Sequence, residues 1–134
     1  MSKVFRHFVQ ALAYLWASPN TLLGLLIGAL GMATRGSVRT KAGIVEFHGG
    51  AVTWLLQRFP GNPAAMTLGH VVIARTEAAL DVTHLHEMVH VRQYQRWGPL
   101  FIPAYLLCSL VLWIKRKDPY RDNPFEVEAY SIAP

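Results

Sequence analysis

The sequence predicts an α+β fold in which a small β-sheet is followed by helices that carry the candidate functional residues. Three features of the 134-residue chain predict it: an apolar N-terminal stretch, short apolar runs separated by glycine turns, and well-marked helical patterns in the last third. A chain of this length forms one hydrophobic core. We therefore expect residues 1–42 to be an apolar membrane-associating helical segment and residues 43–134 to form the folded core.

The composition indicates an apolar, anionic partner. Hydrophobic residues make up 52% of the chain and charged residues only 16%, where soluble domains have about a quarter charged. The formal net charge is +5. The basic residues flank apolar stretches, as Lys3, Arg6 and Lys115–Lys117 do, and do not alternate with aromatic residues. This pattern predicts contact with membrane lipid and not with nucleic acid.

The N-terminal stretch has no charged residue from Phe8 to Thr34, and Ser18-Pro19-Asn20 interrupts it at its middle. Each half is shorter than the roughly 20 residues that a membrane span needs. We therefore expect helices over Phe8–Ala17 and Thr21–Ala33, paired as a hairpin in or on one leaflet. This predicts a peripheral or monotopic membrane protein. A kinked single span and a buried hairpin in a soluble core are the alternatives.

The middle of the chain predicts three short strands. Gly43–Phe47 and Ala51–Leu56 are apolar runs on either side of the turn signal His48-Gly49-Gly50. Thr67–Ile73 is a third run of this kind, with a glycine inside it. Together these segments predict a small sheet.

Three helices are predicted after the sheet. Asp81 is a suitable N-cap for a helix from Val82 to Trp97, which Gly98-Pro99 would end. Leu100–Ile114 is a second apolar helix, and Asn123-Pro124 is a typical start for a third.

The first of these helices carries His86-Glu87-Met88-Val89-His90. Residues four apart lie on one face of a helix, about 5–6 Å apart at Cβ, so both imidazoles can reach one zinc ion. Glu87 lies beside the metal, where a carboxylate can take a proton from an activated water molecule and pass it to a leaving amine. The motif therefore supplies two candidate ligands and one candidate general base.

A catalytic zinc ion needs a third protein ligand. The downstream candidates are Glu126 and Glu128, each of which could instead serve the start of its helix, as a capping residue or a first-turn charge. His84 falls on the far side of the helix from His86, and His70 could line the cleft from the third strand. The spacing alone leaves the choice open.

The pattern of His86–His90 followed by a glutamate on a later helix resembles the gluzincin zinc metallopeptidases, in particular the small minigluzincin-type domains of bacterial proteins. The resemblance covers roughly Thr67 to Tyr130. It implies a zincin-like fold, a zinc ion, a peptide or protein substrate held by strand addition along Thr67–Ile73, and peptide-bond hydrolysis with Glu87 as general base.

The resemblance extends to the related membrane-embedded CAAX prenyl-protease group, in which an aspartate follows the ligand glutamate by four residues. It places Glu126 on the metal and Tyr130 at the position of that aspartate, which normally orients a ligand histidine. Because tyrosine brings no charge, Glu128 stays an alternative ligand.

Four further residues are candidates for supporting roles. Tyr120, Tyr130 and His70 could donate to an oxyanion, and Gln93, one turn beyond His90, could hold a ligand in place. The alternative function is a non-catalytic zinc-binding membrane protein that acts as a sensor or interaction module and does not need Glu87.

One topological constraint follows from the candidate ligands. If Leu100–Ile114 crossed a bilayer, His90 and Glu126 would lie on opposite sides and could not share a metal. We therefore expect this segment to be a core helix or an in-plane membrane helix.

Overall fold

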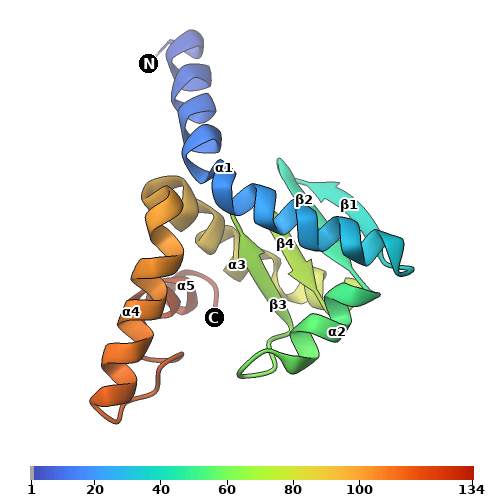
Figure 1. Ribbon diagram of the computed structural model, residues 1–134. Coiled ribbons are helices and arrows are strands. Elements are labelled where there is room, and N and C mark those ends of the chain that lie inside the picture. Colours follow the sequence, from blue (N-terminus) through green and yellow to red (C-terminus); the bar gives the residue numbers. More distant parts are fainter. Residues whose placement is uncertain (1) are drawn as a thin grey trace.

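The computed structural model describes residues 2–134 and has an α+β fold, with a four-stranded mixed sheet between helices (Figure 1). The elements in chain order are α1 (Lys3–Ala33), β1 (Ser37–Lys41), β2 (Ile44–His48), α2 (Ala51–Arg58), β3 (Ala65–Leu68), β4 (Val71–Ala74), α3 (Glu77–Trp97), the short 3-10 helix η1 (Gly98–Leu100), α4 (Phe101–Ile114) and α5 (Pro124–Ile132).

The sheet has the strand order β1-β2-β4-β3. β2 and β4 are parallel, and the two outer pairs are antiparallel. Val71 and Ile73 of β4 pack with Val52 and Leu56 of α2, whereas Val72 packs on the opposite face with residues of α3. The central strand β4 is therefore buried on both faces, with α1 and α2 on one side and α3 on the other.

The N-terminal hairpin prediction is wrong, because α1 is one continuous 31-residue helix that contains Pro19. A proline inside a helix leaves the carbonyl four residues earlier without its usual donor. Here the hydroxyl of Ser18 donates to that carbonyl, on Leu15, at 2.7 Å. Asn20 is buried and donates from Nδ2 to the carbonyl of Gly98 at 2.9 Å. Ser18 and Asn20, which resemble turn residues in the sequence, thus replace the hydrogen bond lost at Pro19 and attach the helix to η1.

A line of glycines lets α1 lie close to the sheet. Gly24, Gly28 and Gly31 are all buried on the face that meets the core. A Cβ atom at Gly24 would lie 2.7 Å from Cβ of Val71, and one at Gly28 would overlap the ring of Phe47. Only glycine permits this approach of helix backbone to strand side chains.

Two of the strand predictions are also wrong. Ala51–Leu56 is the start of α2, whose buried residues Val52 and Leu56 are four apart, as on one face of a helix. The expected strand Thr67–Ile73 is the hairpin of β3 and β4, which turns at Gly69 with φ of +64°. Gly43–Phe47 corresponds to β2, and the sequence did not predict β1.

The helices after the sheet agree better with expectation. α3 ends at Trp97, with Gly98 in the left-handed region, and α5 begins at Pro124 with Asn123 as its cap, as predicted. The predicted N-cap is wrong: α3 begins at Glu77 with Thr76 as cap. Asp81 instead accepts a hydrogen bond from Arg39 at 2.7 Å, which ties β1 to α3.

Within residues 2–134, two helical segments are long and apolar enough to cross a membrane. One is α1, and the other is the run from Glu77 to Ile114 that comprises α3, η1 and α4.

The close approach of α1 predicts the effect of a side chain at position 28. Gly28→Leu should lower the free energy of unfolding by about 2–3 kcal/mol, because the new side chain meets the ring of Phe47. Ala29→Leu adds the same side chain one residue later on the exposed face and should change stability by less than about 0.5 kcal/mol. Chemical denaturation in mild detergent, followed by circular dichroism, measures both. Equal stabilities would contradict this packing.

Candidate metal centre

The helices α3 and α5 bring three candidate metal ligands together. Nε2 of His90 lies 3.2 Å from Nε2 of His86 and 2.7 Å from Oε1 of Glu126, and His86 Nε2 lies 3.2 Å from the same carboxylate oxygen. All three potential ligand atoms lie within 4.8 Å of one another. The third member is therefore Glu126, from a helix about 40 residues beyond the histidine pair in the chain.

Local structure explains how α5 presents this glutamate. Asn123 is fully buried, and its Oδ1 accepts a hydrogen bond from the backbone N–H of Phe125 at 3.0 Å. Its Nδ2 donates to the carbonyl of Tyr105 and to the hydroxyl of Ser109, both on α4. The cap thus starts α5 and attaches it to α4, which sets Glu126, three residues later, against α3.

Two of the three separations between the ligand atoms match those around a tetrahedral zinc ion. Two ligand atoms of a tetrahedral zinc ion, each about 2.0–2.1 Å from it, lie about 3.3 Å apart. The two separations from His86 Nε2 are 3.2 Å, and the third, between His90 and Glu126, is 2.7 Å. Two imidazoles and one carboxylate are also the ligand set of several catalytic zinc sites.

His90 and Glu126 form a buried ion pair beside His86. Burial opposes ionisation of Glu126, but hydrogen bonds and charge from His86 and His90 outweigh it and lower the pKa of the carboxyl to about 2. Burial likewise opposes a charge on His90, but its hydrogen bond to Glu126 and the charge of Glu87 raise the pKa of this imidazole to about 9. The site therefore favours a concentrated positive charge next to Glu126.

Gln93 holds His90 in one orientation. Its Nε2 donates to the carbonyl of Phe125 at 2.9 Å and to Oε1 of Glu128 at 3.1 Å. Its Oε1, 2.8 Å from Nδ1 of His90, must then accept the proton of that nitrogen. Nε2 of His90 is consequently the atom that faces the ligand cluster.

The alternative ligand Glu128 is not in the cluster. Its carboxylate accepts from Gln93 and so supports the residue that orients His90. Two of the tyrosine candidates lie nearby: the ring of Tyr130 is 4.5 Å from that of His86, and its hydroxyl is 3.0 Å from the hydroxyl of Tyr120.

His70 does not join the cluster. Its ring stacks on Tyr14 of α1 at 3.7 Å, and Gln95 Nε2 donates to its Nε2 at 2.9 Å. Burial lowers the pKa of this imidazole. His70 thus links α1, α3 and the turn between β3 and β4.

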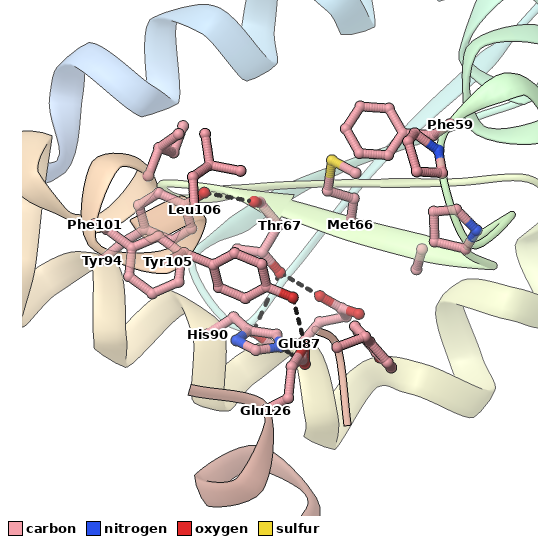
Figure 2. Close-up of a pocket in the computed structure, with 15 residues that line it drawn as sticks. Phe59, Met66, Thr67, Glu87, His90, Tyr94, Phe101, Tyr105, Leu106 and Glu126 are labelled. Carbon is pink, nitrogen blue, oxygen red and sulfur yellow. Dashed lines mark hydrogen bonds and ion pairs between the residues drawn. The ribbon is translucent and has the colours of Figure 1, made fainter. Parts of the chain in front are cut away.

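Glu87 lies beside the ligands but is held separately from them (Figure 2). The hydroxyl of Thr67 on β3 donates to its Oε2 at 2.5 Å, and Tyr94 donates to the carbonyl of Thr67 at 2.9 Å. The side chain is 6% exposed, and burial raises the pKa of its carboxyl. A carboxyl with a raised pKa is suited to proton transfer near neutral pH.

Two supporting residues were not predicted. The hydroxyl of Tyr105 on α4 donates to Oε2 of Glu126 at 3.2 Å, and Thr67 orients Glu87 as described above. The sequence signal for Tyr105 is weak: it is one of two hydroxyl-bearing residues, with Ser109, in the uncharged run of residues 100–114.

Two hollows meet at Glu87. The first is a cavity of about 270 Å³ in which Glu87, His90 and Glu126 face mainly apolar side chains: Phe59, Pro60, Pro63, Ala65, Met66, Phe101, Ile102 and Leu106 (Figure 2). The second, of about 490 Å³, is lined by His86, Glu87 and Tyr130, among others. Tyr120 and Ala65 line both. An extended ligand that occupied both hollows would pass over Glu87.

Comparison of the chain with protein-family models, with curated proteins and with solved structures finds no match.

Proposed function

We propose that this chain is a zinc-dependent peptidase of the gluzincin-like, minigluzincin type. One observation carries the proposal: two imidazoles and a carboxylate from two different helices converge within 4.8 Å, beside a fourth residue, Glu87, that is held by its own hydrogen bond. A metal ligand set with a separate carboxylate next to it is the arrangement that metal-assisted hydrolysis requires.

His86, His90 and Glu126 would hold the metal, with Gln93 and Tyr105 orienting them. A zinc ion, when bound, supplies a Lewis acid that polarises a carbonyl and activates water. Glu87 would accept the proton that the attacking water loses and would donate it to the amine that leaves when the C–N bond breaks. Its burial and its contact with Thr67 support this role, because both fix the carboxylate in one position.

The edge strand β3 supports binding of an extended peptide. The backbone N–H of Arg75 donates to the carbonyl of Ala64, so this pair of opposite residues is hydrogen-bonded. Hydrogen-bonded and non-hydrogen-bonded pairs alternate along an antiparallel ladder. The N–H and C=O groups of Ala65 and Thr67 therefore point away from β4, toward the open edge of the sheet. Tyr94 already occupies the carbonyl of Thr67, which leaves the groups of Ala65 and the N–H of Thr67 for a substrate. The apolar cavity beside them would receive an apolar side chain of that peptide.

Tyr120 is the better supported of the candidate oxyanion donors. It lines both hollows next to Glu87, whereas Tyr130 lines the second alone, and His70 lines neither. A hydroxyl in this position could donate to the oxygen on which negative charge develops.

The proposal predicts about one zinc ion per chain, which elemental analysis of the detergent-purified protein measures. Glu126→Ala should lose the zinc, because it removes one of three ligands. Glu128→Ala removes a nearby carboxylate that lies outside the ligand cluster and should keep it. A wild-type chain without zinc after reconstitution would overturn the metal site, and loss in the Glu128 variant alone would reverse the ligand assignment.

The hydrogen bond of Gln93 to His90 predicts a weaker effect on the same site. Gln93→Leu should lower zinc affinity about 10–100-fold, because His90 loses the acceptor that orients its ring. Gln95→Leu, two residues later, loses a contact to His70 only and should leave the affinity unchanged. Competition with a chromophoric zinc chelator gives both values. Equal affinities would show that Gln93 does not position the ligand.

Glu87→Gln separates catalysis from metal binding. The variant should keep its zinc but hydrolyse peptides about 10²–10⁴ times more slowly than the wild type, because the amide cannot accept the proton. Mass spectrometry of a peptide mixture incubated with each protein measures the rates. A variant as active as the wild type would contradict the role of Glu87. A zinc-loaded wild type that cleaves none of the peptides would favour the sensor or interaction module.

A further inference from the structure

Helix α4 is covered by the rest of the chain on one side only. Its 14 residues include no charged residue, and Phe101 is the only buried one. Tyr105 and Ser109 face the loop of residues 115–123, which they contact through Asn123 and through the carbonyl of Pro119. On the opposite side Leu107 and Ile114 are 62% and 65% exposed. A helix of this length is marginal in water without a packed face, so an outer partner is expected.

The first half of α1 is equally uncovered. No residue from 2 to 16 is buried, and Val4, Phe8, Leu12 and Leu15 are all exposed. Counted from its start, the helix first reaches the body of the protein at Tyr14 and Trp16, which donate to the carbonyls of Gly43 and Arg96. Its second half then packs along the sheet. From this junction the first half of α1 projects upward and α4 downward in Figure 1, and both lie to the left of the sheet in that view.

Both bare helices have a basic far end and no acidic residue. Lys3 and Arg6 lie at the start of α1, and Lys115, Arg116 and Lys117 directly follow α4. No acidic residue precedes Glu46 in the chain, and none lies in α4. Apolar faces that end in clusters of lysine and arginine are complementary to a surface of anionic lipid, where the side chains reach the headgroups.

We propose that the first half of α1 and the outer face of α4 (Leu107, Leu110, Val111, Trp113 and Ile114) form one docking surface for an anionic bilayer. The two helices lie in the plane of the membrane, with their apolar sides in the boundary between headgroups and acyl chains.

The loop of residues 115–123, which follows α4, favours this in-plane arrangement over a span. Residues 115–123 run back along the inner side of α4, where Ser109 donates to the carbonyl of Pro119. If α4 crossed the bilayer, the loop residues Asp118, Arg121 and Asp122 would enter the hydrocarbon with it. The bare part of α1, residues 3–16, and α4 have 14 residues each and are only about 21 Å long, against about 30 Å of hydrocarbon. The second half of α1 is packed on the sheet. With α4 in the plane, the loop stays on the water side.

The docking surface also borders the cavity of the candidate metal centre. Ile102 and Leu106 of α4 line that cavity, and Leu106 is itself 60% exposed next to Leu107. The peptides that reach Glu87 would then be apolar segments at the membrane surface. This consequence rests on the proposed function, whereas membrane binding does not, and the following experiments measure binding without any hydrolysis.

Flotation with vesicles of phosphatidylcholine, with and without phosphatidylglycerol, tests the surface. The wild-type chain should bind, more strongly when phosphatidylglycerol is present. Replacing Leu107 and Leu110 together by Glu should weaken binding by about tenfold or more, because two carboxylates would enter the apolar boundary. As a matched control, Val82 and Leu85 on α3 are also exposed, and their replacement by Glu should leave binding unchanged.

Two results would overturn the proposal. One is equal vesicle binding of the α4 variant and the wild type. The other is a wild type that does not bind vesicles and is a dimer by light scattering, while the α4 variant is a monomer. A second copy of the chain would then cover the surface.

Cysteine labelling tests the in-plane arrangement. In a Cys108→Ala background, Lys3→Cys and Lys117→Cys each place one thiol at a far end of the docking surface. With the protein added to intact vesicles, a membrane-impermeant maleimide should label both variants completely from outside. Labelling of one end only, or of about half of each, would show that the ends lie on opposite sides and that the chain spans the bilayer.

Discussion

Ionisable side chains that are buried without partners are costly, and this constraint governs how α3 and α5 meet. Glu126, His90 and Glu87 are all buried, and none of them lacks a polar contact. The carboxylate of Glu126 is shared by two imidazoles and by the hydroxyl of Tyr105. Because each contact comes from a different turn or helix, the cluster holds α3, α4 and α5 in one arrangement. The same contacts leave the ligand atoms where a metal would need them.

The supporting residues extend this arrangement outward. Asn123 joins the start of α5 to α4, and Gln93 joins α3 to α5 while it orients His90. Thr67 brings the sheet into the same network through Glu87. The candidate centre therefore connects the sheet with the three C-terminal helices, and displacement of any one of them would move a ligand or its partner.

The apolar character of the chain is divided between two tasks. On the sheet side, the glycines of α1 allow a close approach that buries Phe47, Val52 and Val71. On the outer side, α4 and the first half of α1 leave large aliphatic and aromatic side chains exposed. In the arrangement that we propose, the bilayer covers these exposed side chains, which the small core does not bury. Binding to the bilayer also brings the cavity of the candidate metal centre near the membrane surface.

The sequence by itself determined the local features of this protein. The i, i+4 spacing of His86 and His90, the end of α3 at Gly98 and the start of α5 at Asn123-Pro124 depend on neighbours within one or two turns, so pattern and capping predicted them. The tertiary structure decided the rest. It brought Glu126 to the histidines and turned Glu128 toward Gln93, it made Ala51–Arg58 a helix, and it carried α1 through Pro19. Each of these outcomes depends on partners distant in the chain, such as the carbonyl of Gly98 for Asn20 and the hydroxyl of Tyr105 for Glu126. Local propensity contains no information about such partners, because their contribution exists only once the chain has folded.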